Sequence, residues 1–592
     1  MYILGISCYY HDSAACLLKD GELIVAAEEE RFTRIKHDFS FPYHAIKFCL
    51  EYEGITSKNL DFVVFHEKTF LKFERIIKTL LSTYPKSCKV FGEVAISWLK
   101  DKLWIKATIA GFLNISEYKI KFSEHHLSHA ASAFLCSPFK EAAILTCDGV
   151  GEWATTTLGI GKADWDGKNK NEIKILEEIR FPHSLGLLYS VFTAFLGFRI
   201  NEGEYKVMGM SAFGQPRYVD RIYELIKVNP DGSFRLNMKY FSYHYSPRYS
   251  FNKNFMKLFG RPRTPEARFV IGKDSFIYDN VPITQEEIKE NERFADIASS
   301  IQKVTEDILI KIANYLYKRT KLKKLCMAGG VALNCVANYK VLKETPFDEI
   351  FIQPAAGDSG AALGAALYIW HCLLNKKRGF IMKHVYWGKS YSHKKIKEFL
   401  NKEGIVYKEH NNEDNLIECI CNALINQKIV GWFQNRFEWG PRALGHRSIL
   451  ADPRSPKMKD IVNLKIKFRE PFRPFAPSVL YEFTDLIFDI EHIKEQFPFK
   501  FMLYTIPVRN NLMPAATHID RTSRIQIINK DTNLLYYKLV ETFYKKTGIP
   551  AILNTSFNLK GEPIVNTPQD ALNTFKKSGM DLLVLGNFII EK

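Results

Sequence analysis

The sequence lacks the features of secreted and membrane-spanning proteins. Its 11 cysteines are scattered, odd in number and without a Cys-x-x-Cys pair, which argues against a disulfide framework and a zinc ribbon. Its hydrophobic runs are broken by Lys or Asp well before the ~18 residues that a membrane span needs. Residues 1–5 lack the basic and apolar regions of a signal peptide. We therefore expect a cytoplasmic protein with reduced thiols and no membrane contact.

Composition indicates a large globular chain of basic character. A length of 592 residues predicts more than one domain, and 46% hydrophobic with 25% charged residues allows large cores. The formal net charge of +17 and the pI of about 9.1 suit an anionic partner such as a phosphate, a nucleotide, a nucleic acid or an acidic membrane. A Lys-rich solvated surface explains the same charge equally well, so charge alone decides nothing.

Two parts of the first half share one pattern. An apolar run at residues 2–8, a polar turn at 11–13 and a hairpin signal at Asp20-Gly21 lead to a strand at 22–27. Strand-like residues 142–147 and 153–160 flank a Gly-rich acidic turn in the same way. This repetition predicts a duplicated architecture, and the absence of a short-period repeat argues against a solenoid.

Alternating helical and strand-like segments predict an α/β fold. The expected helices are 125–135, 287–319, 331–341, 361–374 and 416–427, and the expected strands include 322–327, 350–353 and 429–433. The basic stretch 375–393 has no clean period, so we place a boundary there, between domains at 1–378 and 379–592. Residues 203–280 show no clear periodicity and are interpreted as an insertion or a lid.

Four side chains form a candidate metal site. His125 and His129 are four residues apart and share a face of the expected helix. Asp148 ends a strand, and Asp358 begins a helix, where it could equally be an N-cap. Two imidazoles and two carboxylates suit iron, manganese or zinc.

Other polar segments are candidates for anion binding. Gly329 and Gly330 lie where a strand turns into a helix that includes Asn334, a geometry that admits a phosphate but also occurs in ordinary turns. Lys206 between glycines could meet a nucleotide or be a solvated loop residue. Pro-bounded cations at 467–474 and an arginine-containing turn at 440–447 offer forked donors to phosphate, and ion pairing to neighbouring acids is the alternative. The polar loop 554–563 could donate to a phosphate or a carbamoyl oxygen, or could be an ordinary turn.

Together these segments resemble the NodU-type carbamoyltransferases of nodulation-factor and antibiotic pathways. The matching stretches follow the family order over nearly the whole chain: 11–15, 28–34, 125–129, 148–153, 329–334, 440–445, 469–477 and 554–563. The departures, at Cys147, Trp439 and His446, remove none of the proposed ligands.

The resemblance implies a fold and a reaction. It implies a duplicated, actin- and sugar-kinase-like (ASKHA) N-terminal domain and a YrdC-like α/β C-terminal domain. The C-terminal domain would make carbamoyl-adenylate from carbamoyl phosphate and ATP. The N-terminal domain would then transfer the carbamoyl group to a hydroxyl of a small molecule, such as a secondary metabolite or a sugar. The implied cofactors are a divalent metal, iron(II) by resemblance, and Mg²⁺ with ATP.

The resemblance also assigns roles to residues. His11 would be the general base of transfer, since a histidine titrates near neutral pH. The remaining assignments are Lys467, Arg469 and Ser556 as catalytic residues; Lys206, Gly329, Gly330 and Asn334 at the nucleotide; Arg442, Lys467, Arg473, Arg524, Asn554 and Asn558 at carbamoyl phosphate; and His125, His129, Asp148 and Asp358 at the metal.

Two alternatives remain open from sequence. One is carbamoyl transfer in hydrogenase maturation or threonylcarbamoyl transfer to tRNA. The hydrogenase enzymes carry an acylphosphatase module and Cys-x-x-Cys zinc pairs that are not seen here, and the tRNA activities usually reside on separate chains. The other is a nucleic-acid-binding ATPase, suggested by the charge. No recognised nucleic-acid motif supports it, so we expect no nucleic-acid partner.

Overall fold

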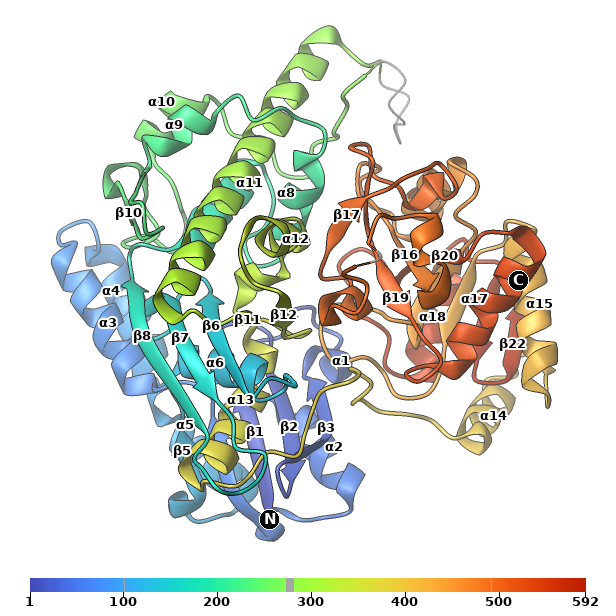
Figure 1. Cartoon of the computed structure of the whole chain (residues 1–592), viewed down its shortest axis with the longest axis horizontal. Helices are drawn as coiled ribbons and strands as arrows, with labels where there is room; N and C mark the ends of the chain where they lie inside the picture. The colour runs from blue at the N-terminus through green and yellow to red at the C-terminus, as the bar shows by residue number, and fades with distance from the viewer. Residues whose placement is uncertain (101, 273–281, 491) are drawn as a thin grey trace. The chain divides into compact units, whose positions relative to one another are not determined.

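The chain forms two compact units of helices and strands, so the predicted α/β class is confirmed. The computed structural model describes residues 1–100, 102–272, 282–490 and 492–592, and Figure 1 shows its elements in chain order. Unit 1 comprises Met1–Glu29, Asp38–Ala267 and Lys289–Met382, and unit 2 comprises Glu30–His37, Arg268–Ile288 and Lys383–Lys592.

Unit 1 is built from two sheets with the same strand order. The first five-stranded sheet runs β3-β2-β1-β4-β5 and the second runs β12-β11-β6-β7-β8. In each sheet, three consecutive strands form an antiparallel meander, and two later strands add in parallel beside the first strand of the meander. The predicted duplication is therefore confirmed by topology.

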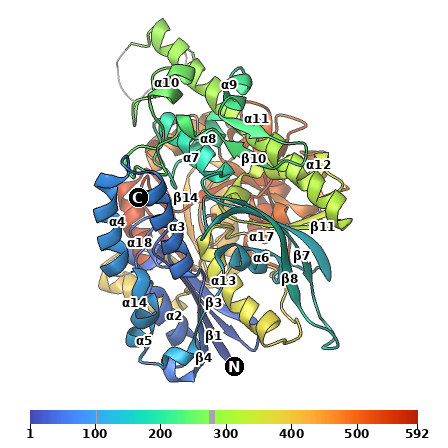
Figure 2. The ribbon, with the colours of Figure 1, turned by 90° about the vertical axis from the view of Figure 1, so that its left-hand side faces the viewer.

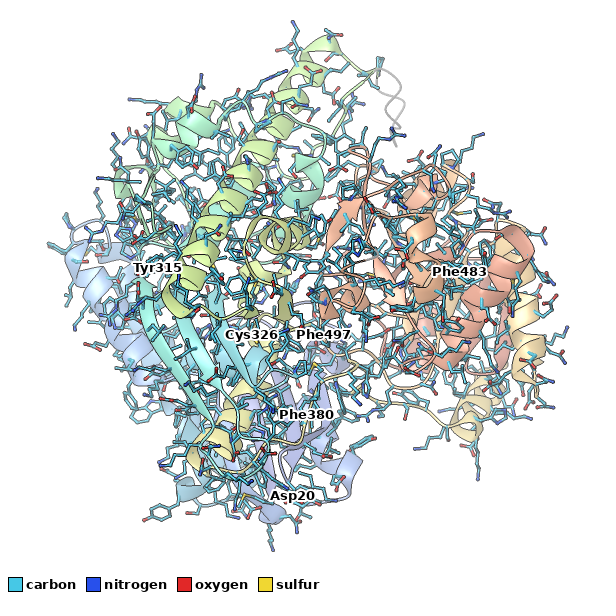
Figure 3. All side chains as sticks on the ribbon, viewed as in Figure 1. Asp20, Tyr315, Cys326, Phe380, Phe483 and Phe497 are labelled. Carbon is cyan, nitrogen blue, oxygen red and sulfur yellow. The ribbon has the colours of Figure 1, made fainter. Side chains whose placement is uncertain are left out.

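The strands match the apolar runs of the sequence. Asp20 and Gly21, both with positive φ, make the predicted tight turn between β2 and β3. The strands of unit 1 in these sheets are β1 Tyr2–Ser7, β2 Ala14–Lys19, β3 Glu22–Glu28, β4 Leu60–Phe65, β5 Ile120–Phe122, β6 Glu141–Cys147, β7 Ala154–Lys162, β8 Glu172–Arg180, β11 Lys324–Ala328 and β12 Glu349–Ile352. Figure 3 shows their side chains, with Cys326 on β11 in the core of the second sheet.

Two helices lie between the sheets. Helix α6 (His125–Phe134) packs on β6 and β11, and α13 (Asp358–Tyr368) packs on β1, β2 and α6. The two helices lie near the centre of Figure 2. They approach closely because Gly364 of α13 has no side chain: a Cβ there would lie 1.8 Å from the Ser128 carbonyl oxygen of α6. Both helices begin with side chains of the predicted metal site.

The following helices also belong wholly or mostly to unit 1. They are α2 Tyr43–Glu53, α3 Thr69–Ser82, α4 Cys88–Lys100, α5 Ile105–Leu113, α7 Leu185–Phe195, α8 Glu204–Ser211, α9 Val219–Tyr223, α10 Lys253–Phe259, α11 Gln285–Thr320 and α12 Cys335–Glu344. Helix α11 was predicted from its periodicity at nearly these bounds.

One expectation for this unit was wrong. The helix expected from residue 331 begins only at Cys335, because Gly330–Leu333 forms a 3₁₀ turn.

The segment 203–280 is structured up to residue 272 and contains α8, α9, α10 and the short strands β9 (Ile226–Val228) and β10 (Phe234–Leu236). Its order comes from aromatic packing: the rings of Phe255 and Phe259 lie 4.7 Å apart, and each lies 5.2 Å from Phe192. Such long-range packing leaves no local period. Residues 273–280 lie outside the described residues.

Unit 2 centres on an eight-stranded mixed sheet in the order β13-β22-β21-β14-β15-β20-β16-β19. Its strands are β13 Lys408–Glu409, β14 Val430–Phe433, β15 Arg447–Ala451, β16 Ala476–Leu480, β19 Gln526–Ile528, β20 Ala551–Ser556, β21 Leu582–Leu585 and β22 Phe588–Glu591, and β17 Thr505–Pro507 pairs with β18 Thr522–Arg524 apart from it. Its helices include α14 His393–Lys402, α15 Glu413–Ile425, α16 Lys457–Ile461, α17 Leu534–Thr547 and α18 Pro568–Lys577. One face of the sheet packs Phe433, Leu553 and Leu583 into a continuous apolar core.

The units are not contiguous in sequence. The main division lies between Met382 and Lys383, close to the expected boundary after residue 378. Unit 2 also takes Glu30–His37, which contains helix α1 (Glu30–Thr33), and Arg268–Ile288. A single boundary near residue 380 therefore assigns both of these segments to the wrong unit.

All 11 cysteines lie among the described residues, and all are free thiols, ten of them at least partly buried. Across the described ranges, no helix has the length and apolar character required to traverse a lipid bilayer.

Candidate active-site clusters

The structure brings the four predicted metal ligands together inside unit 1. His125 and His129 lie one turn apart at the start of α6, Asp148 follows β6, and Asp358 is the first residue of α13. All four are buried, and one ligand atom from each lies within 4.8 Å of the others. A helix start, a strand end and a second helix start thus point at one position.

The spacing of these atoms suits a small cation. The Nε2 atoms of His125 and His129 are 3.1 Å apart, and Asp148 Oδ2 lies 3.0 and 3.5 Å from them. Asp358 Oδ1 lies 3.7 and 3.6 Å from the same two nitrogens. Ligands about 2.1 Å from a tetrahedral metal stand about 3.4 Å from one another, so these separations are those of a ligand set.

The charges and the burial of these four side chains also suit a bound cation. Asp358 Oδ2 is buried without a hydrogen-bond partner among the described residues. Burial disfavours a charged His125, but the carboxylates of Asp358 and Asp148 outweigh it and raise the pKa of this imidazole well above its ordinary value. The same contacts hold the pKa of Asp148 well below its ordinary value against the opposing effect of burial. Such mutually dependent charges are what a divalent cation would satisfy.

Residues that the sequence did not single out support this cluster. Glu67 Oε2 lies 3.6 Å from the other ring nitrogen of His125, Nδ1, and forms a buried ion pair with Lys72 at 2.5 Å. Glu152, in the acidic turn, accepts the backbone N–H of His125 at 3.0 Å and so caps α6. Carboxylates behind metal-bound histidines fix ring orientation. The only sequence signal for Glu67 was its position just after the strand β4.

His11 has both ring nitrogens engaged. Its Nδ1 lies 2.7 Å from Asp12 and its Nε2 lies 2.9 Å from the Asn201 carbonyl oxygen. Burial opposes protonation, but the Asp12 carboxylate and the Asn201 carbonyl together raise the pKa of His11 to about 10. In this structure the ring is therefore an imidazolium at neutral pH and donates hydrogen bonds.

The predicted nucleotide-binding residues lie in a tight junction. Gly329, with φ +93°, follows β11, and a Cβ there would lie 2.3 Å from the Cys147 carbonyl oxygen. The Gly330 N–H donates to Asp148 Oδ1 at 2.9 Å, which connects this turn to the metal cluster. Asn334 caps α12 and exchanges hydrogen bonds with Gln302. Lys206 is not in a loop: it is buried on α8, 5.5 Å from the Phe198 ring.

A second cluster lies in unit 2 around Lys467. Lys467 is buried, and its Nζ donates to the carbonyl oxygens of Ser556 (2.6 Å) and Asn558 (3.0 Å) and to Asn558 Oδ1 (2.7 Å). Burial, together with Arg469 and Arg473, lowers its pKa well below the ordinary value. A bound anion would reverse this shift, so anion binding and protonation of Lys467 would reinforce each other.

Further cations gather near Lys467. Arg469 donates its Nε to Asn463 at 2.7 Å, and Arg473 pairs with Glu470 at 3.6 Å, as the ion-pairing alternative anticipated. Lys459, which the sequence did not single out, has its pKa lowered by burial and by Arg469, against the effect of Asp460. Burial and the nearby charges of Arg524 and Lys459 lower the pKa of His518 to about 4, whereas the charge of Asp520 opposes this shift. Arg524 Nε has no hydrogen-bond partner in the described part of the chain.

Other predicted residues are already engaged in the fold. The side-chain amide of Asn554 donates to Ser478 and Gln526 on neighbouring strands. Arg447 of the arginine turn is fully buried and donates to backbone carbonyls, including that of Asn435, so it holds the turn together. Arg442 is half-buried in the same turn.

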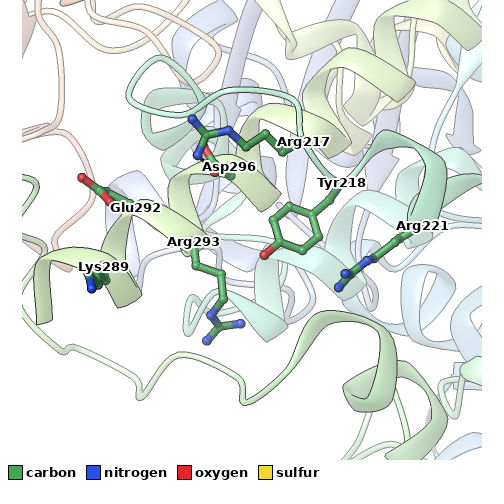
Figure 4. A pocket seen from close by; sticks show the side chains of 7 residues that line it. All are labelled: Arg217, Tyr218, Arg221, Lys289, Glu292, Arg293 and Asp296. Atoms are coloured by element: carbon green, nitrogen blue, oxygen red, sulfur yellow. Dashed lines mark hydrogen bonds and ion pairs between the residues drawn. The ribbon is translucent and has the colours of Figure 1, made fainter. Parts of the chain in front are cut away.

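Unit 1 also has a basic surface pocket of about 400 Å³ (Figure 4). It is lined by Arg217, Tyr218, Arg221, Lys289, Glu292, Arg293 and Asp296. Arg217 pairs with Asp296 at 3.1 Å, Arg221 donates to the Leu258 carbonyl oxygen at 2.7 Å, and Arg293 donates to that of Arg261 at 2.8 Å. These contacts give the arginines a structural role.

Comparison with known proteins shows the family of this chain. The family model for the carbamoyltransferase N-terminus matches residues 2–367, and that for the carbamoyltransferase C-terminus matches residues 421–592. An uncharacterized protein of Synechocystis sp. is 44% identical over 100% of this chain and 97% of its own length. Nodulation protein NolNO of Sinorhizobium fredii is 35% identical over 99% of this chain and 79% of its own.

The chain belongs to the carbamoyltransferase family, as its motifs predicted. It is therefore an enzyme that transfers a carbamoyl group. Among solved structures, HypF of T. kodakarensis is similar over 63% of this chain and 48% of its own, with 14% identity and a TM-score of 0.30, a likeness too distant to add to the fold description.

Proposed function

We propose that this enzyme is an ATP-dependent O-carbamoyltransferase that works in two steps. Unit 2, which we take to be YrdC-like, activates the carbamoyl group as carbamoyl-adenylate. Unit 1, which we take to be actin- and sugar-kinase-like, transfers it to a hydroxyl of a small molecule. The observation that carries the proposal is the buried cation cluster at Lys467, in a unit separate from the His125–Asp358 cluster.

In the first step, water cleaves carbamoyl phosphate to carbamate and inorganic phosphate. A carbamate oxygen then attacks the α-phosphorus of ATP, and pyrophosphate leaves. Lys467 and Arg469 offset the charge on the phosphates, and Ser556 and Asn558 orient the substrate from the end of β20. Arg442, Arg473, Arg524 and Asn554 surround the carbamoyl phosphate, and Mg²⁺ accompanies ATP.

In the second step, the acceptor hydroxyl oxygen attacks the carbamoyl carbon and AMP leaves. In its unprotonated form, His11 takes the hydroxyl proton at Nε2, and Asp12 holds the ring through Nδ1. Gly329, Gly330, Asn334 and Lys206 bind the adenylate. His125, His129, Asp148 and Asp358 fit a divalent metal, for which we favour iron(II), and when bound it would supply positive charge to the adenylate.

The proposal predicts products that can be weighed. Full-length enzyme with carbamoyl phosphate and ATP should release pyrophosphate and phosphate without an acceptor. A panel of hydroxylated metabolites should contain one that gains the mass of a carbamoyl group. Secondary metabolites and sugars, the acceptors that the family resemblance implies, belong in that panel. Transfer that proceeds equally well without ATP would refute the adenylate route.

The cation cluster gives the sharpest mutational test. Lys467→Ala or Arg469→Ala should lower pyrophosphate release by about 10²–10³, or roughly 3–4 kcal/mol, as for removal of one preorganised donor to a developing charge. If these cations served only in surface ion pairs, worth about 0–1 kcal/mol, turnover would stay within about twofold of wild type. Thermal melts of each variant separate loss of catalysis from loss of fold, and exposed Lys394→Ala serves as the matched control.

A further inference from the structure

Unit 2 contains a short segment from the beginning of the chain. The crossover arm (Glu30–His37) belongs to unit 2, while the residues on either side of it belong to unit 1. Both flanks are fixed in unit 1. Glu29 accepts the backbone N–H groups of His44 (3.1 Å) and Ala45 (2.8 Å), and the Asp38 carbonyl accepts the N–H of Ser13 at 2.8 Å. The arm is thus an excursion of eight residues with both ends anchored.

The arm donates hydrogen bonds to two loops of unit 2. The side chain of Arg31 is 2% exposed and donates to the Gly440 carbonyl oxygen at 2.7 Å. Arg34 places its two Nη atoms on the carbonyl oxygens of Ile564 (2.7 Å) and Pro563 (2.8 Å). Gly440 opens the turn that contains Arg442, and Pro563 ends the loop that contains Ser556 and Asn558. Both loops therefore belong to the site that we assign to carbamoyl phosphate and ATP.

The arm also brings charge to that site. Lys36 lies two residues after Arg34, whose guanidinium is anchored on the carbonyl oxygens of Ile564 and Pro563, so the arm brings its positive charge to this loop. Consistent with this position, its charge adds to burial, Arg469 and Arg473 in lowering the pKa of Lys467, whereas Glu562 acts in the opposite direction. Cations gathered at one place offset the negative charge of a phosphate that binds there. The contacts of Arg31 and Arg34 fix the arm mechanically, and the lysine between Arg34 and the anchored Asp38 adds a cation at a site that we propose holds phosphates.

We propose that the crossover arm is part of the carbamoyl-adenylate-forming site: Lys36 binds phosphate oxygens, and Arg34 positions the Ser556–Asn558 loop. This inference rests on the proposed function of unit 2. Lys36 would be a binding residue and Arg34 a positioning residue. Unit 2 would then be catalytically complete only with residues that lie over 340 positions before its main stretch begins at Lys383.

The test uses the full-length enzyme without an acceptor. Pyrophosphate release is measured against carbamoyl phosphate and ATP concentration, and binding of inorganic pyrophosphate is measured by calorimetry. Lys36→Ala should raise the KM of at least one substrate and the pyrophosphate Kd about 10- to 100-fold, as expected for loss of one charged contact, with little change in kcat. Lys36→Arg should restore most of the loss, because it returns the charge.

Arg34→Lys keeps the charge but removes the forked contact, so it should lower kcat more than it raises KM. Lys394→Ala, a substitution of an exposed lysine in the same unit, should behave as wild type.

If Lys36→Ala and Arg34→Lys stay within about twofold of wild type while Lys467→Ala loses activity, the arm has no such role. If Lys467→Ala also leaves both readouts unchanged, the proposed site itself is wrong and the inference falls with it. Should Arg34→Lys fail to fold, Lys36→Ala and Lys36→Arg alone decide.

Discussion

At the scale of residues, the four predicted metal ligands show how the position of a side chain on a helix decides its contacts. Helix α6 begins with two adjacent histidines, yet only His125 joins the cluster together with His129. His126 turns away, and its Nδ1 lies 2.7 Å from the Thr146 hydroxyl. One residue of offset on a helix rotates a side chain by about 100°, which explains why neighbours with the same side chain have different surroundings.

We predict that the variant His125→Ala/His129→Ala loses a bound divalent ion. The wild-type chain should carry one ion, measured by elemental analysis of enzyme purified with iron(II) or reloaded with it. His126→Asn is the matched control, since it removes a buried histidine from the same helix while an amide can still reach Thr146. The assignment fails if wild-type enzyme binds no metal under any condition and still transfers carbamoyl groups, or if the control loses the ion as well.

At the scale of elements, the geometry of the metal cluster depends on the contact between α6 and α13. Gly364 allows that contact, and α13 in turn carries Asp358. The cluster therefore depends on a residue that touches none of its ligands.

Gly364→Ala should push the two helices apart. We expect a loss of stability of about 1–3 kcal/mol from overpacking, seen as a lower Tm, together with weaker metal binding as Asp358 moves. Gly111→Ala is the control. Gly111 is exposed on helix α5 and nothing lies within 4 Å of a Cβ added there, so the methyl group should be neutral or stabilise by up to about 1 kcal/mol. Normal melting and normal metal content in Gly364→Ala would contradict this account of the helix contact.

At the scale of the whole molecule, the proposed mechanism divides one reaction between two chemically different sites. The cation cluster in unit 2 suits phosphates, whereas the His11–Asp12 pair and the metal cluster in unit 1 suit transfer to a hydroxyl. A substitution in one unit should therefore affect one step.

We predict that His11→Asn still releases pyrophosphate from carbamoyl phosphate and ATP but transfers the carbamoyl group poorly. A base must be unprotonated to accept a proton, and the pKa of His11 is raised to about 10. Transfer by wild-type enzyme should thus rise with pH from 7 towards about 10, roughly tenfold per unit at first, and His11→Asn should lose this dependence. Stability at pH 7–9 is checked by thermal melts. Equal loss of both steps, or a flat wild-type profile for a transfer-limited reaction, would exclude His11 as the base.

The sequence by itself determined the α/β class, the duplication in the first half and the family. These rest on local patterns: apolar runs of strand length, the Asp20-Gly21 turn and short motifs whose order survives without knowledge of the fold. It also selected His125, His129, Asp148 and Asp358, and Lys467 with Ser556 and Asn558. The first set converges because strand ends and helix starts of one unit meet there, and the second because Lys467 reaches the loop after β20.

Only the tertiary structure decided the rest. Order in residues 203–272 comes from ring contacts between distant residues, which leave no period. The pKa of His11 is raised first by the adjacent Asp12 and further by the carbonyl group of Asn201, 190 positions away. The role of Glu67 depends on its approach to His125, and the place of Glu30–His37 in unit 2 depends on carbonyl groups at positions 440, 563 and 564. Each is a long-range contact, and no local pattern of residues encodes which distant backbone a side chain will meet.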